Sequence, residues 1–140
     1  MPMDINAYLG VHTAALKLRE QRTELLANNL ANSDTPGFKA RDLDFKGALQ
    51  AATGPANTPG ALAASAHGKS LGTAGAAGAA EGSTETFLKY RTPLAPSLDG
   101  NTVDVQLEQA AFAENAVRYQ ATLTMLNNKF RTLLTAIMGS

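Results

Sequence analysis

Two aspartates, Asp42 and Asp44, come closer to the spacing of a catalytic pair than other residues of this sequence. They flank Leu43 in a segment that we predict to be extended, so both carboxylates would project from one face of the chain. General acid–base catalysis needs such a group within hydrogen-bonding reach of a reacting atom, and nothing else around this pair has the look of a catalytic group. A role in acid–base catalysis is therefore a weak interpretation of Asp42 and Asp44.

The other residue types that could carry chemistry are scattered along the chain. His12 falls in a predicted helix and His67 in a Gly-rich stretch, whereas a metal site needs ligands that converge. No serine stands in a nucleophile elbow, and no glycine-rich loop follows a strand or opens a helix to hold a phosphate. The absence of cysteine excludes disulfides, thiolate ligands and a cysteine nucleophile. We predict that the protein is not an enzyme and uses no cofactor, metal or small-molecule substrate.

Phe38, Lys39 and Arg41 could stack on and bind a nucleic acid, because an aromatic ring beside cations is typical of such sites. Two cations and one ring are a weak pattern in a chain of zero net charge. A contact with a protein partner, or a solvated edge, is the stronger interpretation. We expect no nucleic-acid partner.

The composition argues against a compact globular core. Of the 140 residues 44% are hydrophobic, but alanine inflates that share, there is no tryptophan, and only 6% are aromatic. The first residues lack a basic region followed by an apolar run, so no cleavable signal is predicted. No apolar run approaches the roughly 20 residues that span a bilayer, so we expect no direct membrane insertion. The chain is then soluble, or leaves the cytoplasm by a route that reads no signal peptide.

Residues 26–45, LANNLANSDTPGFKARDLDF, predict a sharp corner after a helix. Asparagine side chains compete for backbone hydrogen bonds at a helix end, and Pro36 followed by Gly37 suits a type II turn. Phe38, Leu43 and Phe45 could simply cover the adjoining helix. The residues that define this corner are Asn28, Asn29, Asn32, Thr35, Pro36, Gly37, Phe38, Arg41 and Asp42.

Two long helices are predicted at the two ends of the chain. The first begins after Asp4 and runs to about Asn32, a length of about 40 Å, with an apolar stripe that is interrupted by polar residues 19–24. The second begins near Asp104 and runs to about Met138, with strict four-three spacing of large apolar residues, which is typical of a coiled-coil seam. The stripes contribute these candidate interface residues: Leu9, Leu16, Leu26, Leu30, Phe112, Tyr119, Leu123, Leu126, Phe130, Leu133 and Ile137.

The predicted fold is mainly α: the two terminal helices pack as a coiled-coil-like hairpin, joined by a flexible Ala/Gly-rich middle with a short extended segment after the first helix. The expected segments are an N-terminal helix (1–33), a turn and extended segment (34–46), a flexible linker (47–83), a short extended and turn segment (84–102) and a C-terminal helix (103–140). Such a pair buries too little apolar surface to order its helices alone. We therefore expect a poorly ordered monomer that orders when it assembles.

The corner sequence and SLDGNTVDVQLEQAAFAENAVRYQATLTMLNNKFRTLLTAI at residues 97–137 resemble the axial proteins of the bacterial flagellum, the family of rod and hook subunits. The pattern ANNLAN…TPGFK is shared across that family, whereas the continuation KARDLDF and the short chain favour the proximal rod. The resemblance covers the two termini, about two-thirds of the chain, and not the Ala/Gly-rich middle.

The resemblance implies that the terminal helices form a layer of a hollow helical tube that transmits motor torque and passes later subunits. It also implies unfolded export through the flagellar type III apparatus, without a cleaved signal peptide, to the basal-body rod in the periplasm. The implied partners are copies of the chain, other rod proteins, and the membrane-ring, export-gate and rod-base adaptor proteins. Phe112, Tyr119, Leu123, Leu126, Phe130 and Leu133 would then face neighbouring helices.

Two alternatives remain open. The chain could be another axial subunit of the rod or hook, which the sequence after TPGFK would distinguish. It could instead be a soluble helical adaptor or export chaperone, which predicts a stably folded, discrete dimer.

Overall fold

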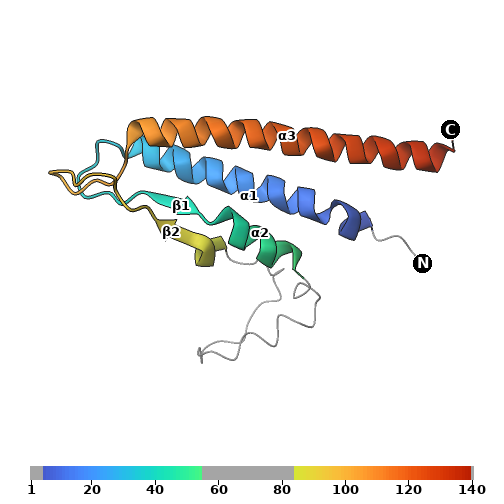
Figure 1. The fold of residues 1–140 in the computed structure, drawn as a ribbon, viewed down its shortest axis with the longest axis horizontal. Helices are drawn as coiled ribbons and strands as arrows, with labels where there is room; N and C mark the ends of the chain where they lie inside the picture. Colours follow the sequence, from blue (N-terminus) through green and yellow to red (C-terminus); the bar gives the residue numbers. More distant parts are fainter. Residues whose placement is uncertain (1–4, 55–83, 140) are drawn as a thin grey trace, which may run out of the picture.

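The computed structural model describes residues 5–54 and 84–139, which are arranged in three layers (Figure 1). Helix α1 (Ile5–Ala31) lies in the middle, and helix α3 (Val105–Met138) lies along one side of it. The other side is covered by strand β1 (Arg41–Leu43), helix α2 (Phe45–Thr53) and strand β2 (Leu88–Tyr90), which follows a 3-10 turn at Thr84–Phe87. Three features of the sequence analysis lie outside the described residues: the helix cap expected at Asp4, the isolated His67, and most of the expected linker.

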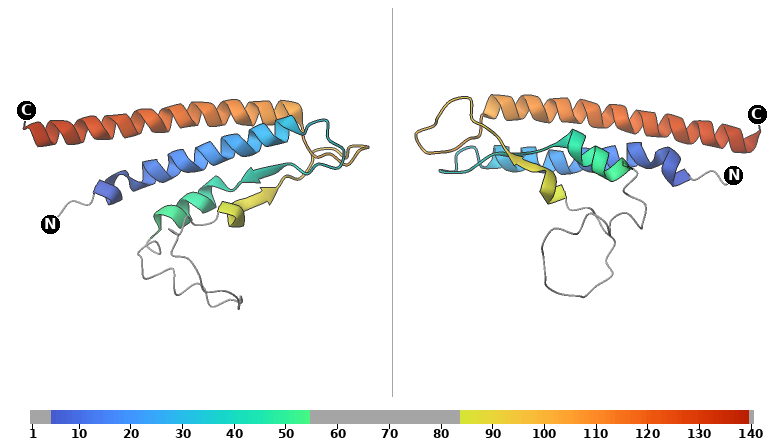
Figure 2. Two further views of the ribbon diagram at one scale, coloured as in Figure 1. Left: turned by 180° about the vertical axis from the view of Figure 1, so that it is seen from behind. Right: turned by 60° about the horizontal axis from the view of Figure 1, so that its bottom comes forward.

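The prediction of a mainly α fold with packed terminal helices is confirmed. Helices α1 and α3 run antiparallel along most of their length, so that both chain termini lie at one end of the molecule (Figure 2). The Asp104 side chain caps α3 by accepting hydrogen bonds from the backbone N–H groups of Gln106 (3.0 Å) and Leu107 (3.2 Å). Gly139, in the left-handed conformation at φ 69°, ends α3.

Helix α2 was not predicted, because the alternation of Leu43, Asp44 and Phe45 indicated an extended chain and residues 47–53 were assigned to the flexible Ala/Gly-rich linker. That assignment is wrong for residues 47–53, which are helical. Instead Asp44 acts as an N-cap whose carboxylate accepts a hydrogen bond from the Gly47 N–H at 3.1 Å, and the helix starts at Phe45. Strand β2 lies in the short extended and turn segment expected at residues 84–102, and it pairs antiparallel with β1, with Asp42 opposite Lys89.

The small apolar core lies between α1 and the layer formed by β1, α2 and β2. Leu18, Leu43 and Ala48 are buried together, and five partly buried side chains pack against them: Leu25, Phe45, Leu49, Phe87 and Leu88. The interpretation that Phe38, Leu43 and Phe45 cover the adjoining helix therefore holds for Leu43 and Phe45, whereas Phe38 is not part of this cluster. The contact between α1 and α3, in which we expected the main apolar seam, instead buries polar side chains of α3.

Candidate functional site

Asn29 holds the returning chain against the end of α1. Its side chain is buried, and its Nδ2 donates to the Arg41 carbonyl oxygen at 2.7 Å while its Oδ1 accepts from the Arg41 N–H at 3.1 Å. One amide side chain therefore satisfies both backbone groups of a strand residue, as a neighbouring strand would. This explains why the corner needs asparagine at this position.

Asn101 performs the matching task from the segment that leads into α3. Its Nδ2 lies 2.9 Å from the Asn32 carbonyl oxygen, 2.8 Å from that of Ser33 and 2.9 Å from that of Thr35. Three carbonyls of the turn that follows α1 are thus bound by one side chain from the segment before α3. Only an extended and turn segment was expected around Asn101, because nothing in a single sequence pairs this residue with carbonyls nearly 70 positions away.

The predicted type II turn is confirmed. The Phe38 N–H donates to the Thr35 carbonyl oxygen at 3.3 Å, and Gly37, at the third position of the turn, has φ 72°. The Gly37 N–H also donates to the Asp99 carbonyl oxygen at 2.8 Å. The turn is therefore fastened to the segment that enters α3.

Four charged side chains join all the layers into one network. The Arg22 guanidinium binds both carboxylate oxygens of Asp42, with Nε–Oδ1 2.9 Å and Nη2–Oδ2 3.0 Å. Arg91 bridges Asp42 (Nη2–Oδ2 2.7 Å) and Glu108 (Nη1–Oε1 2.8 Å), and the Glu108 Oε2 accepts from Asn29 at 3.2 Å. Two cations and two anions balance each other here, and the Glu108 side chain is only 1% exposed.

The environment of Asp42 favours its ionised form. Burial is the largest single influence and would raise the pKa of this carboxyl. The hydrogen bonds from Arg22 and Arg91, the charge of Arg22 and the Leu43 N–H together outweigh burial and hold the pKa below its usual value. Asp44 has a separate partner: its carboxylate lies 2.5 Å from the Lys89 Nζ, and this hydrogen bond lowers the pKa of Asp44. The two aspartates are thus engaged in different structural ion pairs.

The remaining corner residues lie at the surface or make local bonds. The Asn32 Nδ2 donates to the Asn28 carbonyl oxygen at 2.8 Å, and the Thr35 hydroxyl donates to the Asn32 Oδ1 at 3.2 Å. Pro36 and the Arg41 side chain are exposed, and Phe38 is half-buried. The corner is therefore a hydrogen-bonded joint between α1, β1 and α3.

The buried positions of α3 are polar. They are Glu108, Asn115 and Thr122, which recur at intervals of seven residues. The Asn115 Nδ2 donates to the Arg19 carbonyl oxygen and to the Thr23 hydroxyl oxygen, both at 2.9 Å, and the Thr122 hydroxyl accepts from the Arg19 Nε at 3.3 Å. In the next heptad the Lys129 Nζ donates to the Tyr8 carbonyl oxygen at 3.1 Å and lies 4.3 Å from the centroid of the Tyr8 ring. We call Glu108, Asn115, Thr122 and Lys129 the polar row.

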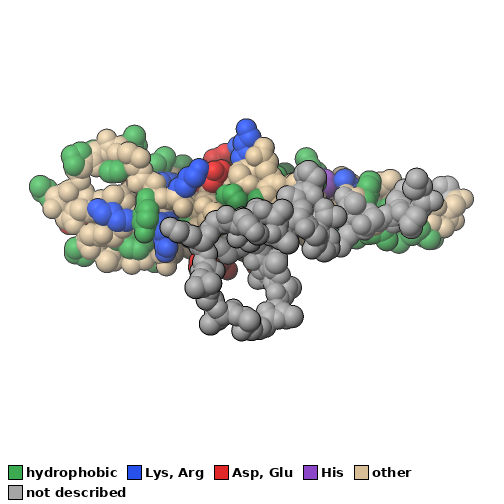
Figure 3. Space-filling model, turned by 90° about the horizontal axis from the view of Figure 1, so that it is seen from below, with side chains coloured by type: hydrophobic (Ala, Val, Ile, Leu, Met, Phe, Trp, Pro, Cys, Tyr) green, Lys and Arg blue, Asp and Glu red, His purple; other side chains and the backbone are tan. Residues whose placement is uncertain are grey.

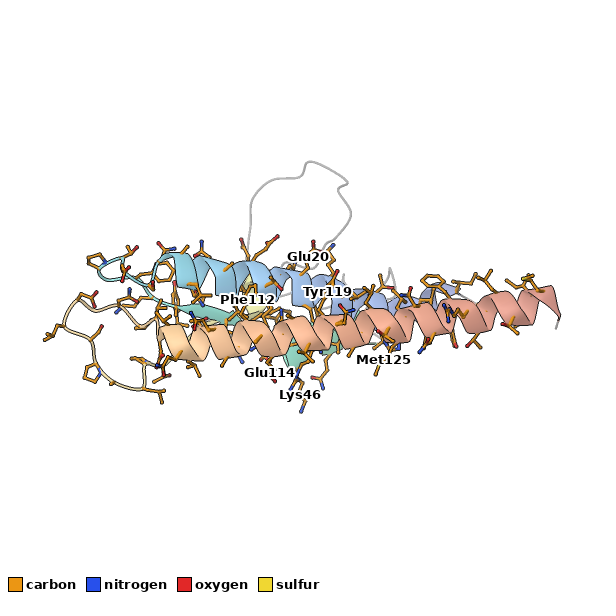
Figure 4. The ribbon with its side chains drawn as sticks, turned by 90° about the horizontal axis from the view of Figure 1, so that it is seen from above. Glu20, Lys46, Phe112, Glu114, Tyr119 and Met125 are labelled. Atoms are coloured by element: carbon orange, nitrogen blue, oxygen red, sulfur yellow. The ribbon has the colours of Figure 1, made fainter. Side chains whose placement is uncertain are left out.

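The predicted seam residues of α3 are left partly open to solvent. Phe112 is 37% exposed, Tyr119 36%, Phe130 45% and Ile137 79%. Phe112 and Tyr119 emerge on the side of α3 next to α1, whereas Glu114 and Met125 emerge on the opposite side (Figure 4). The apolar row, as we call it, consists of Phe112, Tyr119, Leu123, Leu126, Phe130, Leu133 and Ile137, of which the three leucines are half-buried. The candidate residues of α1 are better covered, with Leu9 and Leu26 buried and Leu16 and Leu30 half-buried.

Hydrophobic side chains also gather at the two ends of the molecule, on the loop before α3 and on the last turns of α3 (Figure 3). Leu94, Leu98, Ile137 and Met138 are strongly exposed at these ends. Among the described residues, no three histidine, cysteine, aspartate or glutamate side chains are grouped as metal ligands would be. No described helix has the length and apolar character that a bilayer span requires.

Comparisons with known proteins give a consistent result. The family model described as "Flagella basal body rod protein" matches residues 9–39, which include most of α1 and the turn. A "Flagellar basal body rod protein FlgB" of Cereibacter sphaeroides is 44% identical over 131 residues, which cover 94% of each chain.

Proteins of the same name from two other bacteria are also similar. The one from Aeromonas hydrophila is 38% identical over 140 residues, covering 99% of this chain and 98% of its own. The one from Salmonella typhimurium is 39% identical, covering 96% of each chain. The similarity extends across both terminal helices and the segment between them.

Proposed function

Because the chain belongs to the FlgB family of flagellar basal body rod proteins, we propose that it is a structural subunit of the proximal rod, which polymerises through its terminal helices. In this proposal the subunits build a hollow drive shaft that transmits torque and lets exported subunits pass. The chain contributes helices and joints to this assembly, and no chemical reaction.

The exposed apolar row of α3 is the observation that supports this proposal most directly. Phe112, Tyr119 and Phe130 keep more than a third of their surface open while the buried positions of the same helix are polar. Large apolar side chains lined up along a helix and left open are typical of a surface that another subunit covers. The corner supports the proposal in a second way, because a joint fastened by Asn29, Asn101 and the charged network can keep α1 and α3 in a fixed relation under load.

The proposed partners are further copies of the chain, other rod proteins, and the membrane-ring, export-gate and rod-base adaptor proteins. The proposed location is the periplasmic part of the basal body, reached through the flagellar export apparatus without a cleaved signal peptide. The proposed interface residues are the apolar row together with Leu16 and Leu30 of α1. Leu9 and Leu26, which were also candidates, are buried within the chain and are not proposed as contacts with a neighbour.

The test replaces Phe112 and Phe130 together with serine in a flagellated strain that lacks its own FlgB. The matched control is the double change Gln120→Ser and Asn127→Ser, which alters two exposed polar side chains of the same helix. We expect the control to restore swimming, and the Phe112→Ser, Phe130→Ser variant to be made and exported but absent from purified basal bodies. Normal swimming by that variant would contradict a role of the apolar row in assembly, and failure of the unaltered chain to enter the rod would contradict the proposed function itself.

A further inference from the structure

The contact between α1 and α3 differs from an ordinary coiled-coil seam in the residues that it buries completely. The three buried residues of α3 are Glu108, Asn115 and Thr122, and all are polar, while the large apolar side chains of the same helix remain partly open. A contact selected only for stability would bury the apolar row and expose the polar one.

Each member of the polar row makes its own contact along α1, although Asn115 and Thr122 share Arg19. Glu108 meets Asn29, Asn115 meets the Arg19 carbonyl and Thr23, and Thr122 meets the Arg19 side chain. Lys129 completes the series at Tyr8, near the start of α1. If α3 slid by one turn or rotated on α1, these donors and acceptors would lose their partners together.

Asn115 shows that this arrangement has a cost in stability. The side chain is 1% exposed and its Nδ2 has two acceptors, but among the residues the structure describes its Oδ1 has no hydrogen-bond partner. A buried polar atom without a partner destabilises a helix contact, and a buried asparagine in a coiled coil is known to exchange stability for a single register.

We propose that the polar row is the device that sets the register and rotation of α3 on α1 of the same chain. By doing so it keeps the more exposed part of the apolar row, above all Phe130 and Ile137, available to a neighbouring subunit. This last step rests on the proposed function, whereas the setting of the register does not.

The test measures a distance within one chain. The sequence contains no cysteine, so Glu24→Cys and Asn128→Cys place two spin labels at exposed positions of α1 and α3. Asn128 adjoins Lys129, which contacts the start of α1, so the two labels are separated mainly along the helix axes. A slip of one heptad then changes their distance by about 10 Å. The labelled chain is diluted into an excess of unlabelled chain, at a concentration where helicity is maximal, and the distance is measured by double electron–electron resonance.

We expect one narrow distance in the otherwise unaltered chain, and a broad or displaced distribution, by about 5–10 Å, in the Asn115→Leu, Thr122→Leu variant. Gln120→Leu and Asn127→Leu are the matched control, because they add the same side chains at exposed positions and should leave the distance narrow. If the Leu variant is not helical, Asn115→Ala and Thr122→Ala remove the same contacts with a strong helix former and should broaden the distribution.

An unchanged narrow distance in the helical polar-row variants would overturn the proposal, as would a broad distribution in the chain that carries only the labels. Neither result depends on the swimming assay. Failure of the register proposal is therefore distinguishable from failure of the proposed function, which the Phe112→Ser, Phe130→Ser variant tests.

Discussion

At the residue scale, two glycines with open surroundings are expected to respond in opposite ways to the same added methyl group. A Cβ at Gly37 or at Gly10 would meet no atom within 4 Å, but Gly37 has φ +72° in the type II turn and Gly10 lies inside helix α1. We predict that Gly37→Ala lowers the free energy of unfolding by about 1–2 kcal/mol, because an L side chain is strained in the left-handed region. Gly10→Ala should raise it by up to about 1 kcal/mol through helix propensity.

Urea unfolding followed by circular dichroism, at a concentration where helicity is maximal, would measure both effects. The two variants are controls for each other, since each adds one methyl group in open space. Equal effects of the same sign would contradict the assigned turn.

Asp42 is expected to make stability depend on pH. Its folded-state pKa is lowered, so its ion pairs with Arg22 and Arg91 stabilise the protein fully above the unfolded pKa of about 3.9. The contribution is lost as the pH falls below that value and through the folded pKa. We predict that Asp42→Asn costs about 1–3 kcal/mol at pH 7, and that the variant loses less stability than the unaltered chain between about pH 5 and pH 3.

Unfolding curves collected at several pH values would test this, with Asp34→Asn as the control. Asp34 is exposed and takes part in none of the ion pairs among the described residues, so its replacement should leave the pH dependence as it is. Parallel pH curves for Asp42→Asn and the unaltered chain would rule out the assigned role.

At the scale of elements, the stability of the described part depends on the packing of α1 against α2 and the β1–β2 strand pair. Leu18 is 5% exposed in its core cluster, whereas Leu94, on the loop before α3, is 83% exposed. We predict that Leu18→Ala lowers the free energy of unfolding by about 2–5 kcal/mol and that Leu94→Ala changes it by less than about 0.5 kcal/mol. Comparable losses in the two variants would show that the cluster is not the core.

The sequence carried enough information to predict both long helices, the Thr35–Pro36–Gly37–Phe38 turn and a short extended segment within residues 84–102, because each depends on periodicity or on residues close together in the chain. Helix α2 was missed because the alternation around Leu43 favoured an extended chain, while the cap formed by Asp44 was not considered. Asn101 and Arg91 could not be predicted, since their partners lie far away along the chain.

The face of α3 that contacts α1 was also beyond sequence reasoning. Heptad spacing identified a seam of large apolar residues, but the residues that become buried are Glu108, Asn115 and Thr122, which share the same period. Periodicity shows which residues of a helix share a face, but it does not show which face contacts the partner helix. Two rows with the same spacing therefore cannot be distinguished in this way.

At the scale of the whole molecule, the single chain leaves much of its apolar surface uncovered. The buried apolar side chains of the described part are only leucine and alanine, while aromatic side chains such as Phe112, Tyr119 and Phe130 are exposed. Without a large core, the ordering of two helices of 27 and 34 residues has little to offset its entropic cost. We therefore predict that the isolated chain is weakly helical when dilute and gains helicity as it associates.

Circular dichroism combined with light scattering across a concentration series would measure this. Helicity should rise together with mass, through a range of sizes, because subunits in a rod are related by a head-to-tail operation that does not close into a dimer. The Phe112→Ser, Phe130→Ser variant should show a smaller rise, and Gln120→Ser, Asn127→Ser should follow the unaltered chain. A fully helical dimer at every concentration would contradict folding on assembly and would favour a soluble helical adaptor, because a closed dimer has no free surface on which to grow.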